Sequence, residues 1–391
     1  MADGADQADQ ADRGQGRASR LKWFVRTRRG GVLVGAAVVL VAAGLGTWAT
    51  GNWPFSREDR YCWGSWETNS GPGFLSDTAF EGDDKGARTS EETAPTPRRP
   101  TGRCEVALSS SSTDRDGDET SRSTGITLTY GPAPKDAAER MEWIGAYLGG
   151  RAVPLPDGLP GATDGGRGLL VLPERCDTRD GRPTAVTFDS DARTTWSEGG
   201  ALQSNAGLGG VRSVAGLLVA AANRGMEAAG CAPAKPLRVS SPVLMLPEDE
   251  ESGLFSVACR IKGLEFDKVT SKSLESQVGA VTRDLQSCAV RRERGGGRYF
   301  DALMVAQPRL AALFDGTTGS GAPASGWRGS GVFADAYKVV RADCAGRPVT
   351  LLMVDELAGE TTPYFTAFTN AVTGRLGCAP VAPVASGGSE R

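Results

Sequence analysis

The sequence of 391 residues contains no histidine. Without an imidazole the chain cannot build a Ser-His-Asp or Cys-His nucleophile, a His-ligated zinc site or the usual proton shuttle near neutral pH. The sequence also has no C-x-x-C pair, the spacing typical of thiol redox sites and zinc knuckles. These absences exclude the commonest hydrolase, zinc and thiol-exchange sites, and we expect neither a cofactor nor a metal.

One apolar segment near the N-terminus predicts a membrane span. Residues 30–49 carry no charge, and at about 1.5 Å per residue a helix of this length matches a hydrocarbon core of about 30 Å. Basic residues gather in 20–29 and the charges after the segment balance, so the positive-inside rule places the N-terminus in the cytoplasm and the rest outside. The alternative is a cleaved signal peptide, but the run is long for one and no convincing cleavage site follows.

All eight cysteines follow this segment. An even number in an oxidising compartment predicts disulfides rather than metal ligands. The cysteines are Cys62, Cys104, Cys176, Cys231, Cys259, Cys288, Cys344 and Cys378.

An internal repeat organises these cysteines. The tetrapeptide GCAP occurs at 230–233 and again at 377–380. Before each copy stand an apolar run with a cysteine, a GRP turn and a second apolar run (167–188 and 335–354), which is a hairpin signal. A helical stretch follows each hairpin, and the glycine of GCAP suits the left-handed residue just past a helix, with proline beyond it.

The preceding parts of the two copies match more loosely. Each has a cysteine-bearing strand, a turn, a second strand that ends at proline, and a helix. We therefore expect an α+β fold of two tandem repeats, each an antiparallel sheet of two hairpins with helices packed on it, preceded by one transmembrane helix. The predicted divisions are a disordered cytoplasmic tail (1–29), the transmembrane helix (30–50), a juxtamembrane linker (51–60), ectodomain repeats (61–237 and 238–381) and a flexible C-terminal tail (382–391).

The repeat also predicts which cysteines pair. Cys176 lies beside the GRP turn, and the helix after the hairpin must return toward that turn, so its end brings Cys231 close. The second copy has the same arrangement, and the remaining four cysteines then pair by elimination within each half. The predicted disulfides are Cys62–Cys104, Cys176–Cys231, Cys259–Cys288 and Cys344–Cys378.

Patterns that carry chemistry are weak. The acidic run 112–120 fails the EF-hand spacing and predicts a solvated hairpin loop. The glycine-rich stretches 162–170 and 207–213 do not fit a dinucleotide- or phosphate-binding loop. Trp63 and Trp66 flank Cys62, which favours packing against a disulfide; an exposed pair that binds sugar or a partner is the alternative.

Carboxylates are the remaining candidates for catalysis. Glu248, Asp249, Glu250 and Glu251 crowd a predicted linker, where like charges are usually solvated. Asp355, Glu356 and Glu360 follow a predicted strand, and a pair of carboxylates can serve a glycosidase without histidine. Acidic loop residues are common, so we assign no catalytic residue.

The order of a short basic tail, one apolar segment, CWG at 62–64 and two GRP/GCAP modules resembles uncharacterised single-pass membrane proteins of high-GC actinomycetes. The resemblance covers most of the chain but implies no activity. We expect a membrane-anchored extracytoplasmic protein whose disulfide-stabilised, non-catalytic ectodomain binds a protein or a cell-envelope component; the alternative is an envelope hydrolase that uses acidic residues. No basic stripe indicates nucleic acid as a partner, and the oligomeric state is left open.

Overall fold

The computed structural model describes the chain from Arg60 to Val384 with gaps. The predicted tail, the apolar segment 30–50 and all but the last residue of the linker 51–60 lie outside the described residues. Within the described part, no helix has the length and hydropathy needed to cross a bilayer. The residues inside these bounds that are not described are 82, 197–200, 204–205, 247–257, 263, 265–273, 293–297 and 355–361.

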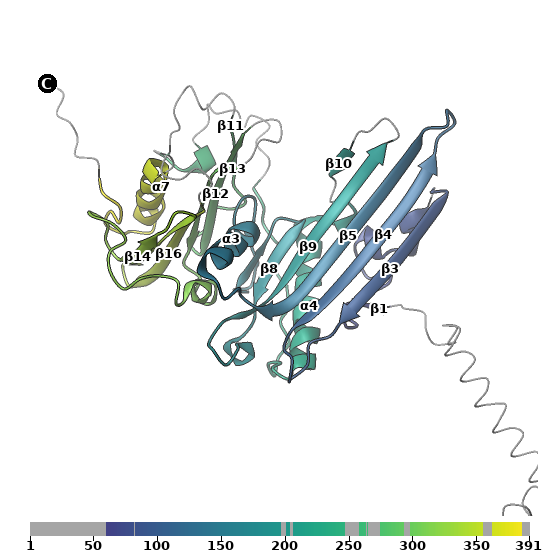
Figure 1. Ribbon diagram of the computed structural model, residues 1–391, viewed down its shortest axis with the longest axis horizontal. Helices are drawn as coiled ribbons and strands as arrows, with labels where there is room; N and C mark the ends of the chain where they lie inside the picture. The colour runs from purple at the N-terminus through teal and green to yellow at the C-terminus, as the bar shows by residue number, and fades with distance from the viewer. Residues whose placement is uncertain are drawn as a thin grey trace, which may run out of the picture. The chain divides into compact units, whose positions relative to one another are not determined.

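The first half of the chain builds a large antiparallel sheet, called sheet 1. Its strand order is β3-β4-β5-β9-β8-β7-β6, with β10 paired to β9 (Figure 1). A small hairpin of β1 (Arg60–Tyr61) and β2 (Trp66–Glu67) precedes it. The strands are β3 (Lys85–Thr93), β4 (Gly102–Thr113), β5 (Glu119–Pro132), β6 (Val153–Pro154), β7 (Gly161–Thr163), β8 (Arg167–Val171), β9 (Thr184–Trp196) and β10 (Ala201–Gln203).

The second half builds a smaller antiparallel sheet, called sheet 2, with the order β11-β12-β13-β16-β15-β14. Its strands are β11 (Leu274–Gln277), β12 (Leu285–Arg292), β13 (Arg298–Val305), β14 (Ser330–Phe333), β15 (Tyr337–Cys344) and β16 (Arg347–Val354). The α-helices of the described part are α3 (Ala137–Leu148) and α4 (Gly210–Ala229) in the first half, and α6 (Pro308–Ala311) and α7 (Thr362–Arg375) in the second.

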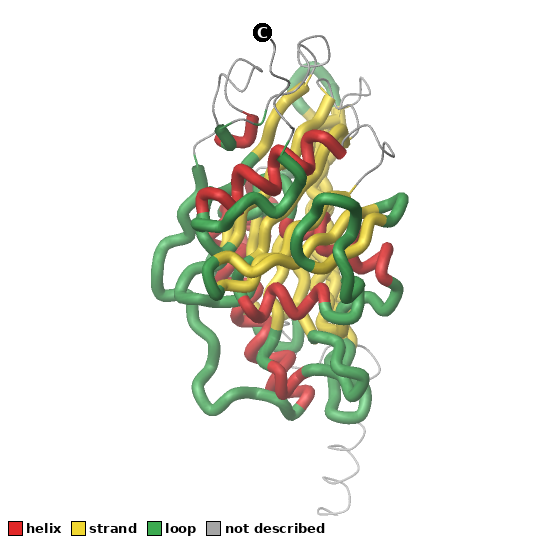
Figure 2. Tube along the Cα trace, turned by 90° about the vertical axis from the view of Figure 1, so that its left-hand side faces the viewer, coloured by secondary structure: helices red, strands yellow, loops and turns green. Residues whose placement is uncertain are grey.

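The predicted fold class is wrong. The described part is mostly β, with three sheets and four α-helices (Figure 2), where the sequence predicts an α+β unit with two hairpins per repeat. The strands that were not predicted from the sequence lie toward the edges of the two sheets. Almost every residue of β3 is exposed, on both faces of the strand, so its sequence lacks the apolar alternation that marks a half-buried strand.

The two sheets nevertheless share one topology. After the β1–β2 hairpin of the first half, each half has three strands, a helix, further strands and a second helix in the same order, and a late strand (β9 or β16) inserts beside the third strand of its sheet. The cross-strand register is also the same, because the cysteine of the second strand starts an equivalent row in both sheets. The matching rows are Cys104–Leu128–Phe188 in sheet 1 and Cys288–Ala302–Met353 in sheet 2.

Each sheet buries one face beneath its last helix. Helix α4 packs on β8 and β9, and its buried stripe includes Val214, Leu218 and Met226, which the spacing of four residues predicts. Helix α7 covers sheet 2 in the same way through Phe365 and Phe368. These are two of the three apolar cores.

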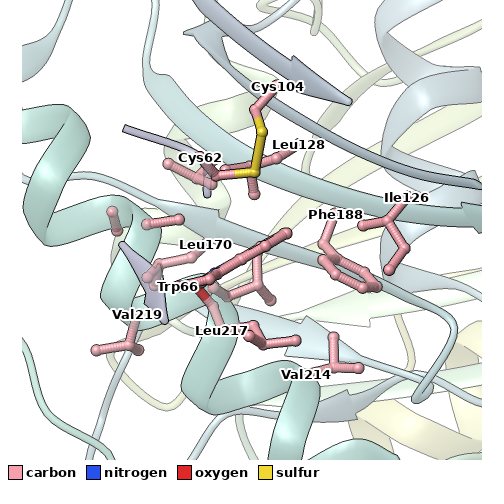
Figure 3. Close-up of a cluster of buried hydrophobic side chains, with 14 of the residues drawn as sticks. Cys62, Trp66, Cys104, Ile126, Leu128, Leu170, Phe188, Val214, Leu217 and Val219 are labelled. Carbon is pink, nitrogen blue, oxygen red and sulfur yellow. A yellow bond between two sulfur atoms is a disulfide. The ribbon is translucent and has the colours of Figure 1, made fainter. Parts of the chain in front are cut away.

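Trp66 lies at the centre of the first core. Its side chain is 1% exposed, and its indole N–H donates a hydrogen bond of 3.1 Å to the carbonyl oxygen of Leu217. Figure 3 shows it below the Cys62–Cys104 disulfide, near Phe188. The prediction that this tryptophan packs against a disulfide is confirmed.

The third core joins the two halves. Helix α3 lies between the sheets and packs on β7 and β8 of sheet 1 and on β13 and β16 of sheet 2 (Figure 1). Arg140 of α3 donates to the carbonyl oxygen of Asp315 at 3.0 Å. In the other direction, Arg309 of α6 donates to the carbonyl oxygen of Leu172 at 2.7 Å. The halves therefore share an apolar core in addition to their separate ones.

All eight cysteines pair as the repeat predicts. The disulfides are Cys62–Cys104, Cys176–Cys231, Cys259–Cys288 and Cys344–Cys378. Each closes within one half, which confirms the predicted disulfide framework.

Both GCAP sequences form the same helix cap. Gly230 and Gly377 have positive φ, 74° and 86°, a conformation that glycine adopts without steric cost. The N–H of Cys231 bonds to the carbonyl oxygen of Met226, and the N–H of Cys378 bonds to that of Thr373, at 2.9 and 3.0 Å. This is the 6→1 hydrogen bond of a Schellman motif. The GCAP tetrapeptide therefore both ends the helix and positions the cysteine of the disulfide.

The segment that leaves the first half is tied down. Asn223 on α4 exchanges two hydrogen bonds of 2.9 Å with the backbone of Leu237. Farther along, the carboxylate of Asp157 accepts hydrogen bonds from the backbone N–H groups of Ser240 and Ser241 and from the Ser241 hydroxyl. The predicted boundary region near 235–243 is therefore anchored on the first half.

Replacement of Asp157 with Ala is expected to release this segment, because three hydrogen bonds to it disappear together. Limited proteolysis should then cut near residues 238–246 at least several-fold faster than in the parent chain, since cleavage follows local opening. Asp116→Ala, in an exposed hairpin turn elsewhere, is the matched control. Equal cleavage rates in both variants would show that Asp157 does not hold this segment on the first half.

Candidate functional site

One face of sheet 1 is covered by helix α3 only over β7 and β8. Val106 and Leu128 point from β4 and β5 into the core beneath α4, so the residues that alternate with them point the opposite way. We call this opposite surface the open face. It carries the odd-numbered residues of β3 (85–93), β4 (103–113), β5 (119–129) and β9 (187–191). Helix α3 packs beside it, on β7 and β8, and reaches it at Asp189 through Tyr147.

The equivalent face of sheet 2 is covered. Helix α3 packs there on β13 and β16, and a Cβ on Gly145 of α3 would come within 2.9 Å of Val354. The helix that corresponds to α3 in the second half is α6, which has four residues where α3 has twelve. Arg309 of α6 reaches Leu172, just past the end of β8, and also pairs with Asp177. A shortened helix therefore leaves the open face exposed.

Residues at equivalent positions of the two faces differ accordingly. On the covered face of sheet 2 they are buried and mostly apolar, whereas on the open face they are polar and, except for Thr187, exposed or half-buried. Polar residues are expected where no helix covers the sheet, because a leucine or valine at these positions would remain in contact with water. The equivalent pairs, open face first, are Glu105 and Ala289, Thr129 and Leu303, Thr187 and Leu352, and Asp189 and Val354.

A polar row crosses the open face from strand to strand. Glu105, Thr127, Asp189 and Arg167 are direct cross-strand neighbours on β4, β5, β9 and β8. Asp189 accepts hydrogen bonds from Arg167 Nε at 3.3 Å and from the Tyr147 hydroxyl at 3.2 Å. Glu105 accepts from Arg103 Nε at 2.8 Å. The row thus presents two carboxylates held in place by neighbouring donors.

Two aromatic residues border this row. Tyr147 reaches Asp189 from α3, and Trp143, one turn earlier, meets the Tyr147 ring edge-on with centroids 5.7 Å apart. Both residues are half-buried, so part of each stays accessible, and the Tyr147 hydroxyl lies next to Asp189. An amphipathic aromatic beside fixed polar groups is typical of binding surfaces.

Tyr147 has a raised pKa. Burial of the phenol is the main cause and the charge of Asp189 is the second. The neutral phenol is therefore favoured in the folded chain, and its contribution to stability is complete below about pH 10 and lost as the pH rises through the raised pKa.

Replacement of Asp189 with Asn is expected to lower the pKa of Tyr147 toward its ordinary value, because the neighbouring negative charge is removed while burial stays. A ¹³C NMR titration of the tyrosine rings measures this shift. Asp116→Asn, in the exposed turn between β4 and β5, should leave the Tyr147 titration unchanged. An unaltered Tyr147 pKa in the Asp189 variant would show that the phenol does not sense this carboxylate.

The open face continues beyond the part of sheet 1 that carries the core. From Ala107 to the end of β4 no residue is buried, and the same holds for β5 up to Gly125. A shallow depression of about 390 Å³ lies there, lined on the open face by Ser109, Ser111, Ser121 and Ser123, with Lys85 at its edge. Hydroxyl groups therefore extend the polar row along the strands.

A second hollow lies on the opposite side of sheet 1. This groove of about 750 Å³ runs along the outer side of α4 and is bordered by residues 64–72. Its floor contains Gly216 and Ala220, and its charged residues include Arg212, which is exposed at the first turn of α4. Its charges are mixed, since Arg224 there forms an ion pair with Glu227 at 2.9 Å.

The other candidates from the sequence have varied outcomes. The acidic run forms a hairpin turn in which Asp114 accepts from the N–H groups of Asp116 and Asp118, which confirms the predicted loop. The carboxylates Glu248–Glu251 and Asp355, Glu356 and Glu360 lie outside the described residues. No group of metal-ligating side chains occurs in the described part.

The tryptophans near Cys62 do not form an exposed pair. Trp66 is buried, and Trp63 is half-buried with its indole N–H bonded to the carbonyl oxygen of Thr93 at 3.1 Å.

The open face of sheet 1 was not predicted from the sequence. Its signal is the break in apolar alternation between Ala107 and Gly125, where β4 and β5 continue with serine, threonine and charged residues.

Comparisons with known proteins identify no relative: no family model, no curated protein and no solved structure matches the chain.

Proposed function

We propose that the chain is a membrane-anchored extracytoplasmic protein that binds a component of the cell envelope through the open face of sheet 1, without catalysing a reaction. The proposal that this face binds a partner rests on one observation. Of two equivalent sheet faces, the one in sheet 1 lacks a long covering helix and has polar residues at the exposed positions. The polar open face is solvated and remains accessible to a partner, whereas the equivalent face of sheet 2 is buried in a core.

The disulfides support an oxidising compartment. Four pairs account for all eight cysteines, and such frameworks persist where the surroundings are oxidising. The uncharged segment 30–49 and the basic residues before it support anchoring with the N-terminus in the cytoplasm. The resemblance to single-pass membrane proteins of high-GC actinomycetes supports the same location.

The proposal is tested with the full chain, immobilised in a non-ionic detergent and exposed to an envelope extract from the organism that makes it. We expect a retained component that is lost when Glu105 and Asp189 are replaced with Gln and Asn. Arg212→Gln, in the groove along α4, serves as the control and should retain it. Retention of nothing by the correctly disulfide-bonded chain, or equal retention by all variants, would overturn the proposal.

A further inference from the structure

The chemistry of the open face points to one class of ligand, and the argument rests on the proposed function. Among its described side chains the face, together with Arg167 of the polar row, has five acidic residues (Glu91, Glu105, Glu119, Asp189 and Asp191) and three basic ones, Lys85, Arg103 and Arg167. A surface with this excess of carboxylates repels polyanions such as nucleic acids and phosphate-rich polymers, whose binding depends on clustered Lys and Arg.

The same face lacks the anchors of a protein interface. Its largest apolar side chains are those of Ala87 and Ala107, whereas the centre of a protein–protein interface is typically apolar and aromatic, with few charged residues. The two aromatic residues stand at the margin, on α3. What remains is a plane of short hydroxyl and carboxylate groups with an aromatic border.

We propose that the open face of sheet 1 binds an uncharged polysaccharide chain. Sugar hydroxyls donate to the carboxylates of Glu105 and Asp189 and accept from Ser and Thr hydroxyls, while an apolar sugar face packs on Trp143 or Tyr147. Neighbouring strands lie about 4.8 Å apart, close to the length of one pyranose unit, so a chain laid across the strands meets one group of the polar row per sugar. No bond is made or broken.

Two features keep this surface ready for a ligand. Asp189 is oriented by Arg167 and Tyr147, and Glu105 is oriented by Arg103, so little side-chain freedom is lost on binding. Each carboxylate also keeps lone pairs for further hydrogen bonds, because a carboxylate accepts about four in all. The serine-lined depression beyond the row lengthens the track along β4 and β5.

The test measures binding of the full chain, in a detergent that contains no sugar, to uncharged glucan, mannan and galactan hexasaccharides by isothermal titration calorimetry. Inorganic polyphosphate serves as the polyanion probe. We expect at least one hexasaccharide to bind, and the affinity to fall at least tenfold in Glu105→Gln and in Asp189→Asn. Arg212→Gln, on the far side of the sheet, should bind as the parent chain does.

Every other result overturns the inference. These results are no binding of any hexasaccharide, binding that Glu105→Gln and Asp189→Asn leave unchanged, loss of binding in Arg212→Gln, or binding of polyphosphate alone. Glu105→Gln changes a half-buried residue of the open face that belongs to no core, so a folding defect is not the expected cause of its effect; the melting temperature of each variant verifies this. If the envelope extract yields a protein retained through the open face while no sugar binds, the inference fails and the proposed function stands.

Discussion

Replacement of both Cys62 and Cys104 with Ala is expected to lower the free energy of unfolding by about 4 kcal/mol, the value that the chain-entropy model gives for a loop of this size. The disulfide closes 42 residues, and both sulfurs are fully buried next to Trp66 (Figure 3). Without the cross-link, the unfolded chain gains conformational freedom and the native core loses a packed pair. Guanidinium unfolding under non-reducing conditions measures the change through the midpoint.

The double variant Cys176→Ala and Cys231→Ala provides the comparison. Its loop is longer, 55 residues, yet Cys231 is only half-buried, so the entropic loss should be similar and the packing loss smaller. Cys62→Ala and Cys104→Ala should therefore destabilise at least as much as this pair. An unfolding midpoint unchanged from the parent chain would show that the buried disulfide does not stabilise the fold.

Replacement of Ile144 with Ala is expected to cost about 3 kcal/mol, within the range measured for buried isoleucines, and to destabilise both halves at once. Ile144 is completely buried on α3 in the core that the two sheets share. Because residues of both halves line that core, the cavity left by the side chain weakens contacts on both sides. Differential scanning calorimetry should give one transition for the parent chain and one, at lower temperature, for the variant.

Glu142→Ala is the matched control, since Glu142 is exposed on the same helix and surface changes of this kind usually alter stability by less than about 0.5 kcal/mol. Two separate transitions in the parent chain, only one of them shifted by Ile144→Ala, would contradict a shared core.

The disulfide framework could be predicted from the sequence because the repeat contains it. The helix end at GCAP and the turn at GRP are both local signals, and Cys176 and Cys231 lie next to them, so the pairing follows once the helix is folded back. The apolar stripe of α4 is visible for the same reason, since Val214, Leu218 and Met226 recur at helical spacing. These features depend on near neighbours in the chain.

The edge strands, the shared core and the open face could not be predicted in this way. Strand β3 is polar on both sides because it lies at an exposed edge, and its pairing with β4 is set by the tertiary fold. The position of α3 between the sheets depends on contacts with β16, more than 190 residues farther along the chain. The open face is recognised only when the two sheets are superposed by their cysteine rows, which needs the register of each strand.

The closure of every disulfide within one half has a consequence for the order in which the chain folds and oxidises. The first half contains both partners of each of its cross-links, so its covalent framework can be completed while the second half is still being delivered. Until α3 meets β13 and β16, however, the part of its apolar surface that faces sheet 2 has no cover. We therefore expect that the first half can form its disulfides before sheet 2 buries this part of α3.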